Sequence, residues 1–206
     1  MVLSTNLIEA TWDTGAYVQT SGVLKRIAVK LSKICNDLRL LSSGPRTGIN
    51  EINLPRLQPG SSIMPGKVNP VIPEVVSQVA FDIIGKDVTI TMAAEAGQLE
   101  LNVMEPIIAF SLANGIHRLR QAMRTLQDRC VSGITANKER CRSMVENSIG
   151  IITALNPYLG YETSASIAKE ALETGGSVLD IVLARNLLSR EKLDDILAPE
   201  HMINRK

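Results

Sequence analysis

Two long stretches of the chain carry apolar residues at alternating spacings of four and three, and this period constrains the fold more than any other feature. One stretch runs from Tyr17 to Leu41, and the other runs from Pro106 to about Cys130. The repeating residues are Ile27, Leu31, Ile34, Leu38 and Leu41 in the first, and Leu112, Ile116, Leu119, Met123, Leu126 and Cys130 in the second. This period keeps one apolar stripe along a long helix and favours left-handed packing against other long helices. We therefore expect an all-α fold built on a long-helix bundle, with the second stretch as its longest helix.

A third helix is predicted from Pro70 to Ile84, with Gly85 as its C-terminal cap and a short helix over 87–96 after it. Its apolar residues surround most of the helix, which indicates that neighbours enclose it on several sides. Three helices with such broad apolar faces have too few partners within 206 residues. We expect either a homo-oligomer or a complementing N-terminal half of the protein to cover them.

The pattern changes after Gly133. Shorter helices are predicted near 137–147, 162–174, 177–186 and 189–197, separated by Asn156-Pro157, by Gly175-Gly176 and by the Leu188-Ser189 junction. Ser177 and Asp180 resemble a capping pair. The sequence thus predicts part of a helical-bundle domain over residues 1–148 and a small helical domain over residues 149–206.

Composition argues against several classes of partner. The net charge is +1, from 22 basic and 21 acidic residues, and only 3% of residues are aromatic, so neither nucleic acid nor an anionic membrane is an expected partner. We expect neither a membrane span nor a secretion signal, because the sequence has no apolar run of about 18 residues and its first residues lack the basic-then-apolar pattern of such a signal. Cys35, Cys130 and Cys141 lack CxxC spacing and are typical of reduced, packed thiols in a cytoplasmic protein. His117 and His201 lie far apart in sequence, so we expect no metal site.

The connection over 44–69 is unusually long for a compact domain, and long loops are more often functional than idle. It ends in the segment GSSIMPGKVN, from Gly60 to Asn69. Gly60 and Gly66 allow close approach to the backbone, which leaves amide donors near Ser61 and Ser62 for an anionic oxygen. Asn69 followed by Pro70 predicts an N-cap and a first helical residue, at the positive end of a helix. An ordinary flexible loop is the alternative.

This segment resembles the signature of the aspartase/fumarase superfamily of lyases, GSSxxPxKxN. All six fixed positions match, at Gly60, Ser61, Ser62, Pro65, Lys67 and Asn69. Residues 32–55, 95–106 and 147–161 resemble three further stretches of the superfamily. Within it, the runs Val71-Ile72-Pro73-Glu74 and Met104-Glu105-Pro106 resemble aspartate ammonia-lyases more than fumarate hydratases.

The resemblance covers about the C-terminal half of a typical subunit. The superfamily's N-terminal substrate-binding positions have no counterpart in the given sequence. Its active-site histidine has none either, because neither His117 nor His201 lies in a matching motif. The resemblance implies a homotetramer with active sites drawn from three subunits, a small dicarboxylate substrate and chemistry that needs no cofactor. We therefore expect aspartate ammonia-lyase chemistry, with little or no activity from this chain alone. Fumarate hydratase, or a catalytically inactive scaffold, is the alternative.

The resemblance also implies roles for individual residues. Ser61 is the expected general base, stabilised as an alkoxide by backbone donors of the Gly60 and Gly66 loop. Ser62, Lys67 and Asn69 are expected to bind the substrate, although Ser62 could serve the loop only and Asn69 could be only a cap. The resemblance pairs Glu74 with a histidine of another subunit; a first-turn glutamate favoured by the helix dipole is the alternative. For Lys67, a simple surface lysine is the alternative.

Overall fold

The computed structural model describes residues 2–44, 46–58, 68–198 and 201, and the chain divides into two compact units. We call Met1–Ala136 the bundle unit and Asn137–Lys206 the C-terminal unit. Within the described residues the architecture is all-α apart from one very small sheet, which confirms the expected fold class. The expected domain boundary near residue 148 falls inside the C-terminal unit and stays a prediction. No helix in the described ranges is long and apolar enough to cross a membrane.

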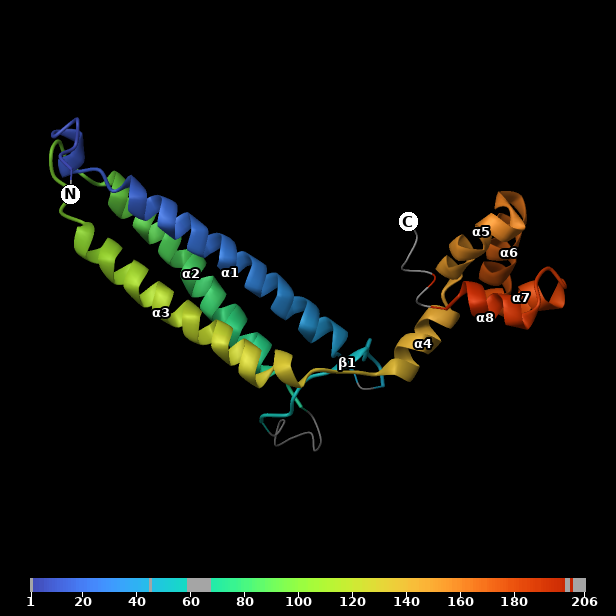
Figure 1. The fold of residues 1–206 in the computed structure, drawn as a ribbon. Helices are drawn as coiled ribbons and strands as arrows, with labels where there is room; N and C mark the ends of the chain where they lie inside the picture. The colour runs from blue at the N-terminus through green and yellow to red at the C-terminus, as the bar shows by residue number, and fades with distance from the viewer. Residues whose placement is uncertain (1, 45, 59–67, 199–200, 202–206) are drawn as a thin grey trace. The chain divides into compact units, whose positions relative to one another are not determined.

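Three long helices form the bundle unit and run side by side along its length (Figure 1). They are α1 (Gly15–Leu41), α2 (Val71–Glu95) and α3 (Glu105–Arg129), with the short 3-10 helices η1 (Glu9–Thr11) and η2 (Val131–Gly133) at their ends. Helix α2 packs against both α1 and α3. The four-three periodicity therefore predicted α1 and α3 to within two residues, but α1, with 27 residues, is longer than α3, with 25, so the expected order of lengths was wrong.

Helix α2 corrects a second expectation, because it continues through Gly85 instead of ending there. A Cβ added at Gly85 would meet no atom within 4 Å, so the glycine lies in open space and caps nothing. An interior glycine costs about 1 kcal/mol relative to alanine. Burial of Ile83 and Ile90, on either side of it, offsets that cost and carries the helix past the glycine.

Polar contacts tie the three helices together at defined positions. The Asp87 carboxylate, on α2, accepts hydrogen bonds from Ser21 Oγ at 2.8 Å and from Lys25 Nζ at 2.9 Å, both on α1. Asp82 accepts a bond from Arg118 Nη1, on α3, at 2.9 Å. Since a one-residue slip would separate these partners, the contacts fix the register of α2 against both neighbours.

A two-stranded antiparallel sheet lies at the end of the bundle unit where α1 and α3 finish and α2 begins. Its strands are β1 (Ile52–Asn53) and β2 (Thr135–Ala136), and Asn53 Nδ2 donates to Thr135 Oγ1 at 3.2 Å. Gly133 permits close packing here, because a Cβ at this position would come within 2.6 Å of Pro55 Cγ. The segment through β1 is thereby held against the chain that follows α3.

The C-terminal unit consists of shorter helices, and those after α4 surround one apolar core. The helices are α4 (Lys138–Glu146), η3 (Ile149–Ile151), α5 (Ile152–Leu159), α6 (Tyr161–Thr174), α7 (Val178–Ala184) and α8 (Arg190–Ile196). Four of them match the expected helices, and Ser177 caps α7 by accepting a bond from Leu179 N at 3.2 Å. Helix α5 was missed, because Pro157 was taken as a separator and lies inside it. Leu155, fully buried in the core, anchors this helix despite the proline.

Candidate functional site

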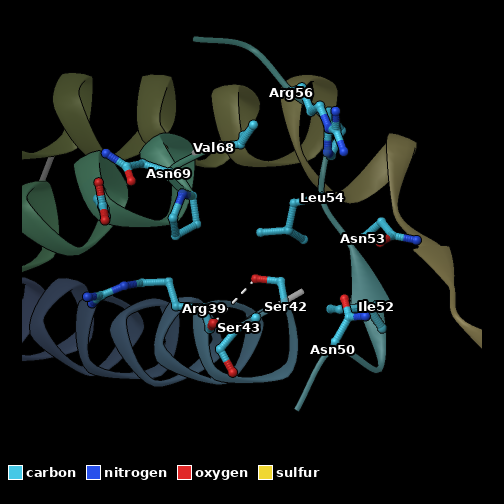
Figure 2. Close-up of a pocket in the computed structure, with 14 residues that line it drawn as sticks. Arg39, Ser42, Ser43, Asn50, Ile52, Asn53, Leu54, Arg56, Val68 and Asn69 are labelled. Atoms are coloured by element: carbon cyan, nitrogen blue, oxygen red, sulfur yellow. Dashed lines mark hydrogen bonds between the residues drawn. The ribbon is translucent and has the colours of Figure 1, made fainter. Parts of the chain in front are cut away.

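The signature is only partly covered by the described residues. Gly60, Ser61, Ser62, Gly66 and Lys67 lie outside them, so their expected roles stay predictions. Asn69 and Glu74 are described, and both line a cavity of about 510 Å³ in the bundle unit (Figure 2). The structure therefore places two predicted site residues at one cavity.

Three segments surround this cavity: the last turn of α1 with the turn that follows it, the segment through β1, and the start of α2. These segments lie far apart in sequence, and the sheet with the α1–α2 contact brings them together. The lining residues are Arg39, Ser42, Ser43, Gly44, Asn50, Ile52, Asn53, Leu54, Pro55, Arg56, Val68, Asn69, Pro70 and Glu74.

The turn after α1 is held by its own hydrogen bonds. Ser43 Oγ donates to Leu40 O at 2.6 Å and accepts from Ile49 N at 3.2 Å. Gly48 lies against the Ser43 backbone, where a Cβ would come within 2.4 Å of the Ser43 carbonyl. Only glycine fits this close approach, so the first wall of the cavity is a compact, defined turn.

The wall continues into β1 through Asn50, which has a left-handed backbone with φ 52°. Asparagine tolerates this conformation better than most residues. Glu51 N then donates to Leu41 O at 2.9 Å, which joins the turn to the end of α1. The route from α1 into β1 is thus fixed by specific residues.

The start of α2 differs from expectation by one residue. Pro70 has φ −78° and ψ 60°, outside the helical region, so it is the N-cap, and Val71 is the first helical residue. The expected arrangement, with Asn69 as cap and Pro70 as first helical residue, was wrong. Asn69 O accepts from Val71 N at 2.9 Å, and Glu74 N donates to Pro70 O at 3.2 Å. Glu74 lies in the first helical turn and is partly buried.

Sequence reasoning missed the two arginines of the cavity. Arg39 comes from the last turn of α1, and Arg56 follows β1, four residues before Gly60. Glu74 is the acidic side chain in the lining, so cationic groups outnumber anionic ones there. Neither arginine belongs to a motif spacing, and only the folded arrangement of α1, β1 and α2 places both at one cavity.

Other candidate groups in the described residues have structural roles. Burial is the largest cause that raises the pKa of Cys35 to about 11, and burial also raises the pKa of Cys130, so both thiols stay protonated at neutral pH and pack in the core. Asn102 is buried, and its Nδ2 donates to Ala93 O at 3.0 Å while its Oδ1 accepts from Met104 N at 2.9 Å. It thus joins the end of α2 to the start of α3. The described part of the chain contains no group of three or more His, Cys, Asp or Glu that could hold a metal ion.

Two sequence profiles of known families match this chain. The sequence profile of the family described as Lyase matches residues 2–85, and that described as Fumarase C C-terminus matches residues 151–204. The aspartate ammonia-lyase of Helicobacter pylori is 64% identical over 203 residues, which cover 98% of this chain and 43% of that protein. The aspartate ammonia-lyase of Escherichia coli (strain K12) is 59% identical over 199 residues, which cover 97% of this chain and 42% of that protein.

The chain is also similar in fold to solved structures. A protein from Brucella melitensis described as fumarate lyase:delta crystallin, bound to cobalt, superposes with a TM-score of 0.94 at 55% identity, over 100% of this chain and 44% of that one. A class II fumarase from Schistosoma mansoni gives a TM-score of 0.87 at 38% identity, over 98% of this chain and 42% of that one.

The fold and the matched profiles define the class: the chain belongs to the aspartase/fumarase superfamily. Within that superfamily it is similar, at 59–66% identity, to proteins named aspartate ammonia-lyase. The chain spans about two fifths of the length of the curated relatives it matches.

Proposed function

We propose that this chain is part of an aspartate ammonia-lyase, which converts L-aspartate reversibly to fumarate and ammonia. The observation that carries the proposal is the identity of 59–66% to aspartate ammonia-lyases over nearly the whole chain. The cavity supports it, because the two described site residues, Asn69 and Glu74, line one space. A fumarase is a more distant match, at 38% identity.

The proposed reaction begins with removal of a proton from Cβ of aspartate. This proton is weakly acidic, because the neighbouring carboxylate is already negative, and the transition state adds a second charge to that carboxylate. Ser61 takes the proton as an alkoxide, and the C–N bond then breaks as its electron pair leaves with ammonia. The enzyme must therefore combine a base at the carbon with strong donors at the carboxylate oxygens.

The donors in this proposal are the signature's backbone amides near Gly60 and Gly66, Ser62, the ammonium of Lys67 and the amide of Asn69. A compact lysine charge suits a single carboxylate. Glu74 lies one helical turn beyond Asn69, and its proposed partner is a histidine from another subunit. This assignment makes the site a shared one, completed by groups outside this chain.

We further propose that the bundle unit associates with copies of the protein and with the segments that precede it in the relatives. Its exposed faces support this, since Phe81 and Met92 on α2 and Phe110 on α3 are more than half exposed. A cytoplasmic location is proposed from the cysteine pattern of the sequence.

The experiment that tests the function supplies this chain with the N-terminal segment of a relative such as the Helicobacter pylori enzyme. Fumarate formation is followed by absorbance, with aspartate or malate as substrate. We expect turnover of aspartate by the combined protein and little or none by the 206-residue chain alone. Ser61→Ala should lower kcat by roughly 10²–10⁴-fold, the usual contribution of a general base.

Ser4→Ala is the matched control, because Ser4 is exposed near the start of the chain and should leave turnover unchanged. Wild-type activity in Ser61→Ala would remove Ser61 as the base. Preferential turnover of malate would identify a fumarate hydratase, and no turnover of either substrate by the combined protein would favour an inactive scaffold.

A further inference from the structure

Gly133 and Thr135, in the chain that follows α3, contact the chain that leads into the signature. A Cβ at Gly133 would come within 2.6 Å of Pro55 Cγ, and the three nearest atoms it would meet all belong to that proline ring. Thr135 Oγ1 accepts from Asn53 Nδ2 at 3.2 Å. We propose that Gly133 and Thr135 are positioning residues for the elimination, because they fix the segment that forms one wall of the cavity. This inference rests on the proposed function.

The same segment is also held by the core of the bundle unit. Leu54 packs against a cluster of buried residues, which are Cys35, Val76, Ala122, Leu126 and Cys130. Asn53, Leu54 and Pro55 all line the cavity. Since the strand register pairs Asn53 with Thr135, three successive residues of the wall have defined neighbours, two of them in the chain after α3.

A short stretch of chain separates this wall from the reactive groups of the proposed function. Pro55 precedes Gly60 by five residues, and Ser61 follows Gly60. Beyond the signature, Asn69 directly precedes the N-cap of α2 and lines the same cavity. A displacement of Pro55 therefore moves the wall relative to Asn69, and the chain that carries the base continues from that wall. A misplacement of about 1 Å caused by a remote residue can lower a rate by roughly 100-fold.

Neither side of the contact between Gly133 and Pro55 yields easily. The proline ring is closed onto the backbone, so it cannot rotate away as a long side chain would. On the other side, Gly133 N donates to Cys130 O at 3.1 Å and Ile134 N donates to Val131 O at 3.2 Å, which holds the η2 turn at the end of α3. A methyl group at Gly133 must therefore displace Pro55 and the segment that contains it.

The test measures turnover of aspartate by this chain combined with the N-terminal segment of a relative. Gly133→Ala should lower kcat by about 10²-fold. KM should rise less, because Asn69 lies at the start of α2 and is not among the atoms nearest to a Cβ at Gly133. Thr135→Val keeps the shape of the side chain but loses its hydroxyl, and it should have a smaller effect of the same kind. Ser132→Ala is the matched control and should leave kcat and KM unchanged, since Ser132 is exposed and its Oγ donates to Gln127 O.

A second substitution separates positioning from a folding defect. Pro55→Ala removes Cγ, the atom that the added Cβ would meet at 2.6 Å. In a double-mutant cycle, Gly133→Ala should therefore lower kcat far less in the Pro55→Ala background than in the wild type. Circular dichroism should show the same helical content in all four proteins of the cycle.

Amide hydrogen exchange of the 206-residue chain tests the contact without any turnover. Peptides that cover residues 50–56 should exchange faster in Gly133→Ala than in the wild type, because the segment loses its fixed position against β2. Exchange there should slow again in Gly133→Ala combined with Pro55→Ala. Peptides of α6, in the C-terminal unit, are the internal control and should not change.

Four results would overturn the inference: an unchanged kcat in Gly133→Ala, an equal loss of kcat in both backgrounds, a loss confined to KM, or unchanged exchange over residues 50–56. Absence of turnover by the wild-type combined protein counts instead against the proposed function. Exchange over residues 50–56 then decides this inference by itself.

Discussion

The two units of this chain bury their apolar side chains to very different extents. In the C-terminal unit the buried apolar residues form one continuous cluster, in which Leu155, Ile167 and Leu193 are fully buried. In the bundle unit the buried residues fall into three smaller clusters, and large apolar side chains such as Phe81 and Phe110 point outward, 58% and 62% exposed. The first arrangement is self-sufficient, whereas the second leaves apolar helix faces that other chains can cover.

The incomplete burial of the bundle unit is visible along the apolar stripe of α3. Leu112, Leu119 and Leu126 are buried against the neighbouring helices, while Ile116 and Met123, from the same four-three repeat, are 47% and 40% exposed. Two neighbouring helices thus cover only part of the stripe. All residues of such a repeat become buried only when further helices pack around α3.

The largest expected effect is in the closed core. Leu193→Ala removes a fully buried side chain of the C-terminal unit, and we expect it to destabilise that unit by about 2–5 kcal/mol. Urea unfolding followed by hydrogen exchange of α6–α8 peptides measures this. Leu172→Ala is the control: Leu172 is exposed, so its loss should change stability by no more than about 0.5 kcal/mol. Equal effects of the two variants would contradict the closed core.

A smaller effect is expected for the polar contact inside the bundle unit. Asp87→Asn removes the charge that receives bonds from Ser21 and Lys25, and it should cost about 1–3 kcal/mol. Burial opposes ionisation of Asp87, but the bonds from Lys25 and Ser21 outweigh it and lower the pKa of Asp87. Its stabilisation is therefore present above the pKa of an unfolded aspartate, about 3.9, and is lost as pH falls through the lower folded pKa.

Acid unfolding at pH 2–5 measures this dependence. Because Asp87→Asn lacks the titrating group, its stability should fall less steeply with decreasing pH than that of the wild type. Asp82, whose pKa is also lowered, against the effect of burial, by Lys86 and Arg118, should retain part of the pH dependence. Identical pH profiles for variant and wild type would show that Asp87 does not fix the α1–α2 contact.

The smallest effect on the stability of the isolated chain is expected at the exposed face. Phe110→Ser should change the free energy of unfolding by no more than about 0.5 kcal/mol, because the ring is already largely exposed. It should nevertheless weaken self-association, as measured by sedimentation equilibrium. Leu172→Ser, on the exposed surface of the C-terminal unit, is the matched control and should leave association unchanged. A loss of association only in Leu172→Ser would reverse the comparison between the units.

The long helices were predictable because period and packing agree. The repeat at Ile27 to Leu41 and the repeat at Leu112 to Cys130 both lie on helices that pack lengthwise. Gly85 and Pro157 do not end their helices, and the reason is the same for both. Each is a local helix breaker, and burial of neighbours such as Ile90 and Leu155 overrides the local preference. Local signals mark a helix end only where packing does not oppose them.

The cavity could not be predicted in the same way. Arg39, Arg56 and Glu74 have no common spacing, and they line one cavity only because α1 packs against α2 and a two-residue strand pairs with another more than eighty residues later. The signature contributes Asn69 to the lining of the cavity, and the role of that residue in binding a substrate stays a prediction. The expected start of α2 was one residue early, because Pro70 adopts a non-helical ψ of 60°.

The most direct test of this account is amide hydrogen exchange of the 206-residue chain, alone and combined with the N-terminal segment of a relative. If the bundle unit exposes faces meant for partners and the C-terminal unit does not, α2 and α3 should gain protection on combination while α6–α8 keep the protection they already have. Unchanged exchange in α2 and α3, or a larger gain in α6–α8, would contradict it.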